Sequence, residues 1–246
     1  MTHFPIPAPA FDGRSRAVGV AAVFAWLRLG WNLFMANPGV WVISTVILIV
    51  GFFVLMIVPL IGTLLTCLLT PVLIAGLFAM CRKAASGGEP GLSDLTAGFS
   101  TRTSPLMMLG VIFMVAAFII EVIVLLLFSG SVVAGGLTMP SPAGIGILLG
   151  GSLLALLLSS LLFIPLWMAM WFAPALVLFN DMPPFEACKA SFVANLKNIL
   201  PFLLLDLILF VLGFFAALPA GLGFLVLIPV LAGTAYASYQ DVFVAH

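Results

Sequence analysis

Long apolar runs separated by short turn-forming segments constrain this chain more than any other feature of its sequence. The clearest runs are residues 38–58, 105–128 and 143–179, which hold a single charged side chain between them. About 20 apolar residues are enough for a helix to cross the hydrocarbon core of a bilayer. Only 7% of the residues are charged, whereas a water-soluble domain usually has about 25%. We therefore predict an all-α integral membrane protein.

The apolar runs pair into three hairpins, which predicts six transmembrane helices. In the first hairpin, Pro59–Gly62 separates two runs, and in the third, Pro219–Gly223 does so. In the middle hairpin, the Gly, Ser and Pro-rich segment 129–142 is expected to be the longest outer loop. Its second run has 37 residues, so we expect one kinked helix, 143–179, whose inner end extends along the headgroups.

An amphipathic surface helix is expected before each hairpin, giving three repeated units at about 15–85, 90–180 and 181–246, after an arm at 1–14. In the first unit this helix is 15–36, because Arg28 would be costly inside a span. In the second it is short, with Ser93 as its N-cap. In the third it places five side chains on one face: Phe185, Cys188, Phe192, Leu196 and Ile199.

Proline positions support the repeat. One proline precedes the first helix of each hairpin: Pro38, Pro105 and Pro201. Others are expected to break the second helices: Pro71, Pro165, Pro174 and Pro229. The two outer units also share a Gly-Phe-Phe sequence, at 51–53 and 213–215.

Orientation follows from the basic residues, which concentrate on the cytoplasmic side of membrane proteins. All eight lie in the N-terminal region or in two of the connections: Arg14, Arg16, Arg28, Arg82, Lys83, Arg102, Lys189 and Lys197. Six spans with both termini in the cytoplasm satisfy every one of them. We therefore expect a multi-pass membrane protein with this orientation.

Two acids lie inside predicted spans, and intramembrane acids are candidate functional residues. Asp206 is about 7.5 Å from the cytoplasmic end of its helix, where Arg28, Arg82 or Lys83 could pair with it. Glu121 is about 24 Å along its helix, toward the outer leaflet and away from every basic residue. It is expected either to be neutral or to emerge into the outer headgroups. Their different depths exclude a carboxylate dyad.

Other chemistry is poorly represented. The two histidines are terminal, His3 and His246, and the three cysteines are scattered, so no metal site, cofactor or catalytic set is expected. The net charge of zero gives no bias toward nucleic acid. Small residues from Gly144 to Ser159 suggest helix packing. An inner aromatic belt is expected from Trp167, Trp171, Tyr236 and Tyr239.

Two segments, 59–99 and 170–202, resemble the hallmark sequences of a family of uncharacterised Gram-negative bacterial integral membrane proteins. More distantly, the alternation of surface helices and hairpins resembles the membrane domain of some glycerophosphodiester phosphodiesterases, whose catalytic domain is not found in this sequence. The resemblance implies an inner-membrane location and supplies no activity.

Three functions remain open. The first is a non-enzymatic scaffold or accessory subunit, including one that handles lipid, with membrane lipid and another membrane protein or a second copy as partners. The second is a small ion- or proton-coupled transporter that uses Glu121 or Asp206. An embedded enzyme ranks last, because no nucleophile and base are paired. A polar cavity enclosed around either acid would favour the transporter.

Overall fold

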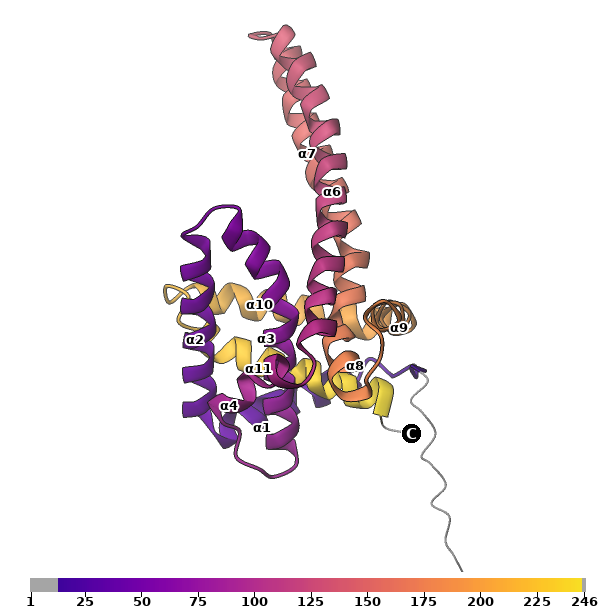
Figure 1. Cartoon of the computed structure of the whole chain (residues 1–246). Coiled ribbons are helices and arrows are strands. Elements are labelled where there is room, and N and C mark those ends of the chain that lie inside the picture. Colours follow the sequence, from indigo (N-terminus) through magenta and orange to yellow (C-terminus); the bar gives the residue numbers. More distant parts are fainter. Residues whose placement is uncertain (1–12, 245–246) are drawn as a thin grey trace, which may run out of the picture.

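A computed structural model describes residues 13–244, and every regular element within that range is a helix (Figure 1). The predicted all-α class is confirmed there, while the arm predicted at 1–14 lies almost wholly outside it. The elements are α1 (Ala22–Ala36), α2 (Pro38–Met56), α3 (Ile61–Ala85), α4 (Leu92–Leu95), α5 (Ala97–Thr101), α6 (Thr103–Leu137), α7 (Pro142–Trp171), α8 (Ala173–Asn180), α9 (Pro184–Lys197), α10 (Ile199–Ala217), α11 (Phe224–Tyr239) and the π-helix η1 (Gln240–Val244).

Five helical stretches are long and apolar enough to cross a membrane: α2, α3, α6, the consecutive α7 and α8, and α10. The sixth predicted span is not confirmed. Helix α11 has only 16 residues, and nearly all of its side chains from Pro229 to Tyr239 are buried. It is therefore a core helix that contacts protein on most sides.

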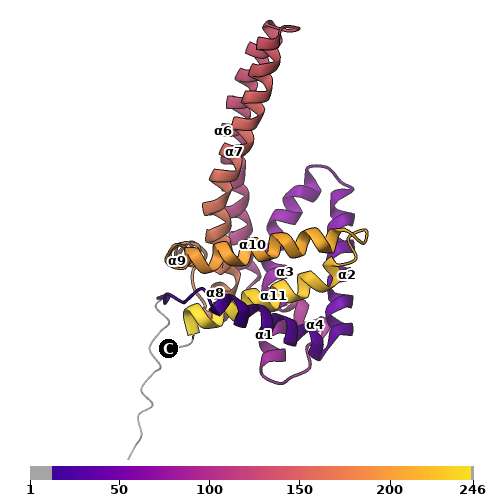
Figure 2. The ribbon, with the colours of Figure 1, turned by 180° about the vertical axis from the view of Figure 1, so that it is seen from behind.

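The long helices run in two main directions. Figures 1 and 2 show the α2–α3 and α6–α7 hairpins roughly side by side, whereas α10 and α11 run across them. Helices α10 and α11 therefore cannot cross the same bilayer at the same tilt as the other four. Helices α2 and α10 both have 19 residues, as equivalent repeats would, but the threefold repeat is not confirmed and remains a prediction.

The α6–α7 hairpin is longer than the sequence indicated. Helix α6 has 35 residues and continues to Leu137, so the long loop predicted at 129–142 is wrong and only 138–141 remain as a turn. At a rise of 1.5 Å per residue, α6 is about 52 Å long, against a hydrocarbon core of about 30 Å. The outer part of the hairpin stands clear of the other helices (Figure 1).

Close packing between α6 and α7 explains why a Gly and Ser-rich segment is helical. A methyl group on Gly144 would lie 2.9 Å from the carbonyl oxygen of Gly135, and Gly151 faces the side chain of Ser131. Small residues let two helix backbones approach this closely. Packing between the helices thus overrides the weak helix propensity of glycine and serine.

The small-residue stripe of α7 divides between two faces. Gly144, Gly151 and Ala155 pack toward α6, whereas a side chain on Gly146 or Gly150 would meet open space. Only the first group therefore serves packing within this chain.

Most of the expected helix breaks do not occur. Pro71, Pro165 and Pro229 lie inside α3, α7 and α11, which continue through them. Pro174 is in the first turn of α8, just after the chain departs from helix at Phe172. Membrane helices tolerate internal proline where neighbouring groups satisfy the freed carbonyl. The kink expected in 143–179 is confirmed by the departure from helix at Phe172.

The core lies where α1, α8, α11, η1 and the second half of α3 meet. Helices α1 and α11 touch through glycines, with the Gly30 Cα only 2.7 Å from where a Gly233 methyl would lie. Aromatic rings pack nearby: Phe172, between α7 and α8, lies 5.6 Å from Phe202 of α10 and 5.2 Å from Phe243 of η1 between ring centroids. The largest fully buried side chains are Trp41, Phe78, Phe172 and Phe243.

Tyr236 and Tyr239 belong to this core, which corrects the predicted aromatic belt. Both are almost fully buried, and their rings lie 6.2 and 5.6 Å from the ring of Phe179. Trp167, by contrast, is 60% exposed. Only the tryptophans therefore remain candidates for the belt.

Helix α9 reverses the predicted faces. Its buried residues are small or polar: Ala187, Cys188, Ser191, Ala194 and Asn195. Phe185, Leu196 and Ile199 are exposed, so of the predicted face only Cys188 is buried. Small side chains let α9 pack closely on α7 and α8, and the large apolar ones point outward together with Lys189, as on a helix at a membrane surface.

The short helix α4 starts differently from the prediction. Gly91 is its N-cap, and the Gly91 N–H donates to the Asp94 carboxylate at 2.7 Å. Asp94 also pairs with Lys83 at 3.0 Å. Ser93 is therefore inside the helix, and the connection is held by a carboxylate.

Candidate functional site

Glu121 lies near the middle of α6, which corrects its expected place toward the outer end. Helix α6 extends about 27 Å from Thr103 to Glu121 and about 24 Å from Glu121 to Leu137. The sequence did not predict the last part of α6, because the glycines and serines after Phe128 are typical of a loop. If α6 crosses a bilayer, this acid is closer to the midplane than to either end.

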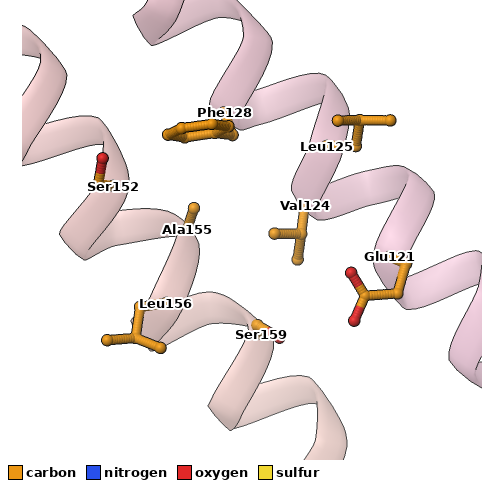
Figure 3. Close-up of a pocket in the computed structure, with 8 residues that line it drawn as sticks. All are labelled: Glu121, Val124, Leu125, Phe128, Ser152, Ala155, Leu156 and Ser159. Atoms are coloured by element: carbon orange, nitrogen blue, oxygen red, sulfur yellow. The ribbon is translucent and has the colours of Figure 1, made fainter.

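The Glu121 side chain lines a groove of about 430 Å³ between α6 and α7 (Figure 3). Its carboxylate points toward α7, on which Ser159 and Ser152 lie. The groove is wide open along one side, and most of its other walls are apolar. The lining residues are Glu121, Val124, Leu125, Phe128, Ser152, Ala155, Leu156 and Ser159.

The polar groups of this groove are one carboxylate and two hydroxyls. Within residues 13–244, Glu121 has no hydrogen bond and no ion pair. The Ser152 hydroxyl donates to the carbonyl of Leu148 in its own helix, at 2.8 Å. Glu121 is thus free to accept hydrogen bonds from outside the chain.

Asp206 lines a second groove, of about 350 Å³, between the end of α7 and the start of α10. Trp167, Trp171 and Phe202 supply aromatic walls, and Asn195 of α9 lies beside them. This groove is more enclosed than the first. It contains no cationic side chain among its lining residues.

The ion pair expected for Asp206 is not present in the described part of the chain. Lys83 pairs with Asp94, and the Arg82 guanidinium lies over the ring of Phe179, 4.3 Å from its centroid. Arg28 is exposed on α1. The sequence placed these three cations at the same end of the membrane helices as Asp206. Because α10 runs across those helices, Asp206 instead faces the end of α7.

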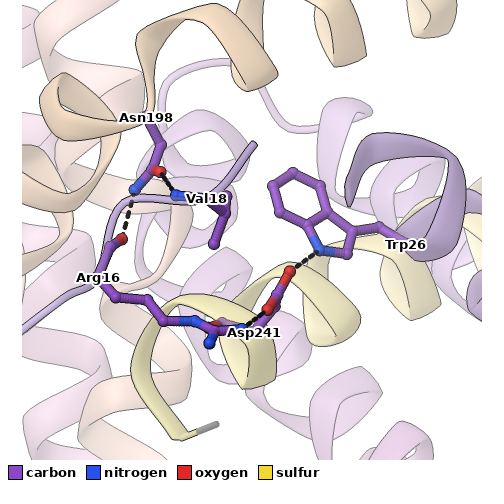
Figure 4. Close-up of polar contacts among 5 residues, drawn as sticks. All are labelled: Arg16, Val18, Trp26, Asn198 and Asp241. Carbon is purple, nitrogen blue, oxygen red and sulfur yellow. Dashed lines mark hydrogen bonds and ion pairs between the residues drawn. The ribbon is translucent and has the colours of Figure 1, made fainter. Parts of the chain in front are cut away.

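A polar junction that the sequence did not reveal ties the N-terminal segment to the end of the chain (Figure 4). Arg16 forms an ion pair with Asp241, whose other carboxylate oxygen accepts from the Trp26 indole at 2.8 Å. Asn198 accepts from the Val18 N–H at 2.7 Å and donates to the Arg16 carbonyl at 3.0 Å. Residues near both ends of the described chain thus meet on one side of the molecule.

A second unpredicted polar contact stabilises the break between α7 and α8. The Ser191 hydroxyl donates to the Met168 carbonyl at 2.7 Å and accepts from the Phe172 N–H at 3.0 Å. The Asn195 amide donates to the same carbonyl at 3.0 Å. These bonds satisfy backbone groups that the break frees. Two small or medium polar residues four positions apart, Ser191 and Asn195, lie on one face of α9, and this spacing was the available signal.

The two acids of the predicted spans line separate grooves, Glu121 the one between α6 and α7 and Asp206 the one between α7 and α10. Among residues 13–244, no three His, Cys, Asp or Glu side chains lie close enough to hold a metal ion. His3 and His246 fall outside the described range.

The chain is 30% identical, over 227 residues, to a protein of Burkholderia thailandensis named probable inner membrane protein. The matched region covers 87% of this chain and 80% of that relative. No protein-family model matches the chain, and no solved structure matches it. The resemblance to the membrane domain of glycerophosphodiester phosphodiesterases remains a prediction.

Proposed function

This chain belongs to the family of the Burkholderia thailandensis probable inner membrane protein, and we propose that it acts as a non-enzymatic scaffold or accessory subunit in the inner membrane. Its multi-pass character rests on the five apolar helices. We also propose that both termini face the cytoplasm, because the basic residues concentrate in the N-terminal region and in the connections at 82–102 and 189–197.

The scaffold proposal rests on the shape and the apolar lining of the two grooves that contain Glu121 and Asp206. Transport needs a polar path that is closed to lipid and opens alternately to either side. Glu121 instead lies in an open groove with mainly apolar walls. The Asp206 groove is also mainly apolar.

The α6–α7 hairpin is the surface that we assign to a partner. No residue in the most apolar 18-residue stretch of α6 is buried within the chain. The hairpin also presents open glycines, Gly146 and Gly150, which let another helix approach. The partner in this proposal is a transmembrane segment of another membrane protein or of a second copy.

Photo-crosslinking in native membranes tests this assignment. A photoreactive amino acid at Leu126 or Leu157, both well exposed on the hairpin, should give an adduct of defined protein mass. The same residue at Phe210, exposed on α10, is the matched control. An adduct with the mass of two chains would identify a second copy as the partner. Lipid adducts alone at both hairpin positions would refute the proposal.

Proton-coupled transport remains the second candidate, because Glu121 lacks a partner in the described chain. The substitution Glu121→Gln is nearly isosteric and keeps a donor and an acceptor. We expect it to leave the melting temperature and behaviour of the protein unchanged. A folded Glu121→Gln protein that loses a proton-linked flux measured for the wild type in liposomes would favour the transporter instead.

A further inference from the structure

The groove between α7, α9 and α10 brings together residues that the sequence keeps well apart. Trp167 and Trp171 come from the last turns of α7, and Phe202 and Asp206 from the first turns of α10. Each pair is four residues apart, so in each helix the two side chains lie on one face. The two faces meet across about 350 Å³, within the range of small-molecule sites.

Aromatic rings form the walls of this groove. Trp171 and Phe202 pack edge to face, with ring centroids 5.9 Å apart. Trp167 packs by its edge on Phe113 at 5.6 Å, yet 60% of the residue is exposed. Ring faces carry negative potential and attract organic cations, and Trp does so most strongly.

The charge of the groove is unbalanced. Asp206 has no ion pair or hydrogen bond among residues 13–244, and no Lys or Arg lines the groove. The amide nitrogen of Asn195 is already committed to the carbonyls of Met168 and Ser191, both at 3.0 Å. A single carboxylate beside aromatic rings does not provide the six or more oxygen ligands that Ca²⁺ requires. It suits an organic ammonium group.

We propose that this groove binds an organic ammonium group, with Asp206 as the counter-ion and Trp167, Trp171 and Phe202 as the aromatic walls. The remaining lining is apolar, including Ile164 and Leu203, and it accommodates the hydrocarbon part of the ligand. An aminophospholipid headgroup and a free amine share this chemistry. The site is independent of the α6–α7 surface, so the scaffold proposal and this one can fail separately.

Native mass spectrometry of the full chain in detergent tests the site. The probes are phosphatidylethanolamine and phosphatidylglycerol at equal concentration, with soluble ethanolamine as competitor. We expect the ammonium lipid to bind at least about tenfold more than the anionic lipid, which corresponds to about 1.4 kcal/mol. Competition by ethanolamine would show that the ammonium group alone is recognised, and a lack of competition would assign the site to the lipid.

Variants separate binding from folding. Asp206→Asn should remove the preference for the ammonium lipid, whereas Asp206→Glu should keep it. Glu186→Gln, which removes an exposed acid of α9, is the matched control and should change nothing. If Asp206→Asn does not fold, Trp167→Ala at the exposed wall should still weaken binding severalfold. Equal binding of the two lipids by the wild type, or an unchanged preference in a folded Asp206→Asn protein, would overturn the proposal.

Discussion

The contact between α1 and α11 predicts a large effect from a single methyl group, in the substitution Gly30→Ala. The new Cβ would lie 2.6 Å from the Thr234 hydroxyl oxygen and 2.8 Å from the Thr234 backbone nitrogen. Neither atom can move away easily, because the Thr234 hydroxyl donates to the Val230 carbonyl at 2.7 Å in a fully buried turn. The two helices must therefore move apart to make room for the methyl group. Overpacking of this kind costs about 1–3 kcal/mol.

The matched control for this change is Gly213→Ala. Gly213 lies inside α10, and a Cβ there meets nothing within 4 Å. Alanine gains about 1 kcal/mol of helix propensity at either position, so the difference between the two variants isolates the close contact. We expect Gly30→Ala to be less stable than Gly213→Ala by about 1–3 kcal/mol, or about 5- to 160-fold in the folding equilibrium constant.

Reversible unfolding in mixed detergent micelles, followed by circular dichroism, measures this difference. A Gly30→Ala protein as stable as Gly213→Ala would show that α1 does not pack against α11 as described. The surface-helix interpretation of residues 22–36 would then lose its structural support, because α1 is held in place by that contact.

Three further predictions follow from the described contacts. Asn195→Ala should destabilise the fold by about 0.5–1.5 kcal/mol in the same unfolding assay, since it removes one of the two donors to the Met168 carbonyl and leaves only the Ser191 hydroxyl. Stability equal to that of the wild type would contradict the network. Burial raises the pKa of the Cys188 thiol from 9.0 to about 11. Folding therefore favours the neutral thiol. The stability that the buried thiol contributes is complete below about pH 9 and is lost as the pH rises through about 11. At pH 9, iodoacetamide should therefore react with Cys188 far more slowly in the native protein than in the denatured chain. Topology can be tested with cysteines substituted at exposed positions and an impermeant maleimide added outside intact cells. Cysteines at Leu60 and Met139 should react, and those at Glu89 and Lys189 should not. The opposite pattern would refute cytoplasmic termini. Leu60 is chosen over the nearby Gly62, where a side chain would strike the Leu55 carbonyl.

The sequence by itself determined the class of the molecule. Apolar length and scarcity of charge are properties of a continuous stretch, so they predicted membrane helices such as α2 and α6 without knowledge of their neighbours. The helix that precedes the third hairpin, observed as α9, was likewise predicted, because the period of its apolar residues is a local signal. The exclusion of Arg28 from a span also rested on a local cost.

The tertiary structure decided what local signals could not. Glycine and serine at 129–137 lower helix propensity, but contact with Gly144 and Gly151 keeps α6 helical to Leu137. The buried face of α9 follows the space that α7 leaves, so small residues are inside and Phe185 is outside.

The surroundings of the two candidate acids depended on how the helices are oriented relative to one another. Both acids could be found by reading the sequence, since an acid within an apolar run is conspicuous. Their surroundings could not, because α10 runs across the other long helices and brings Asp206 to the tryptophans of α7 (Figure 2). Helix direction depends on contacts between residues far apart in the chain, such as Gly30 with Gly233 and Arg16 with Asp241, and those contacts form only once the whole chain packs.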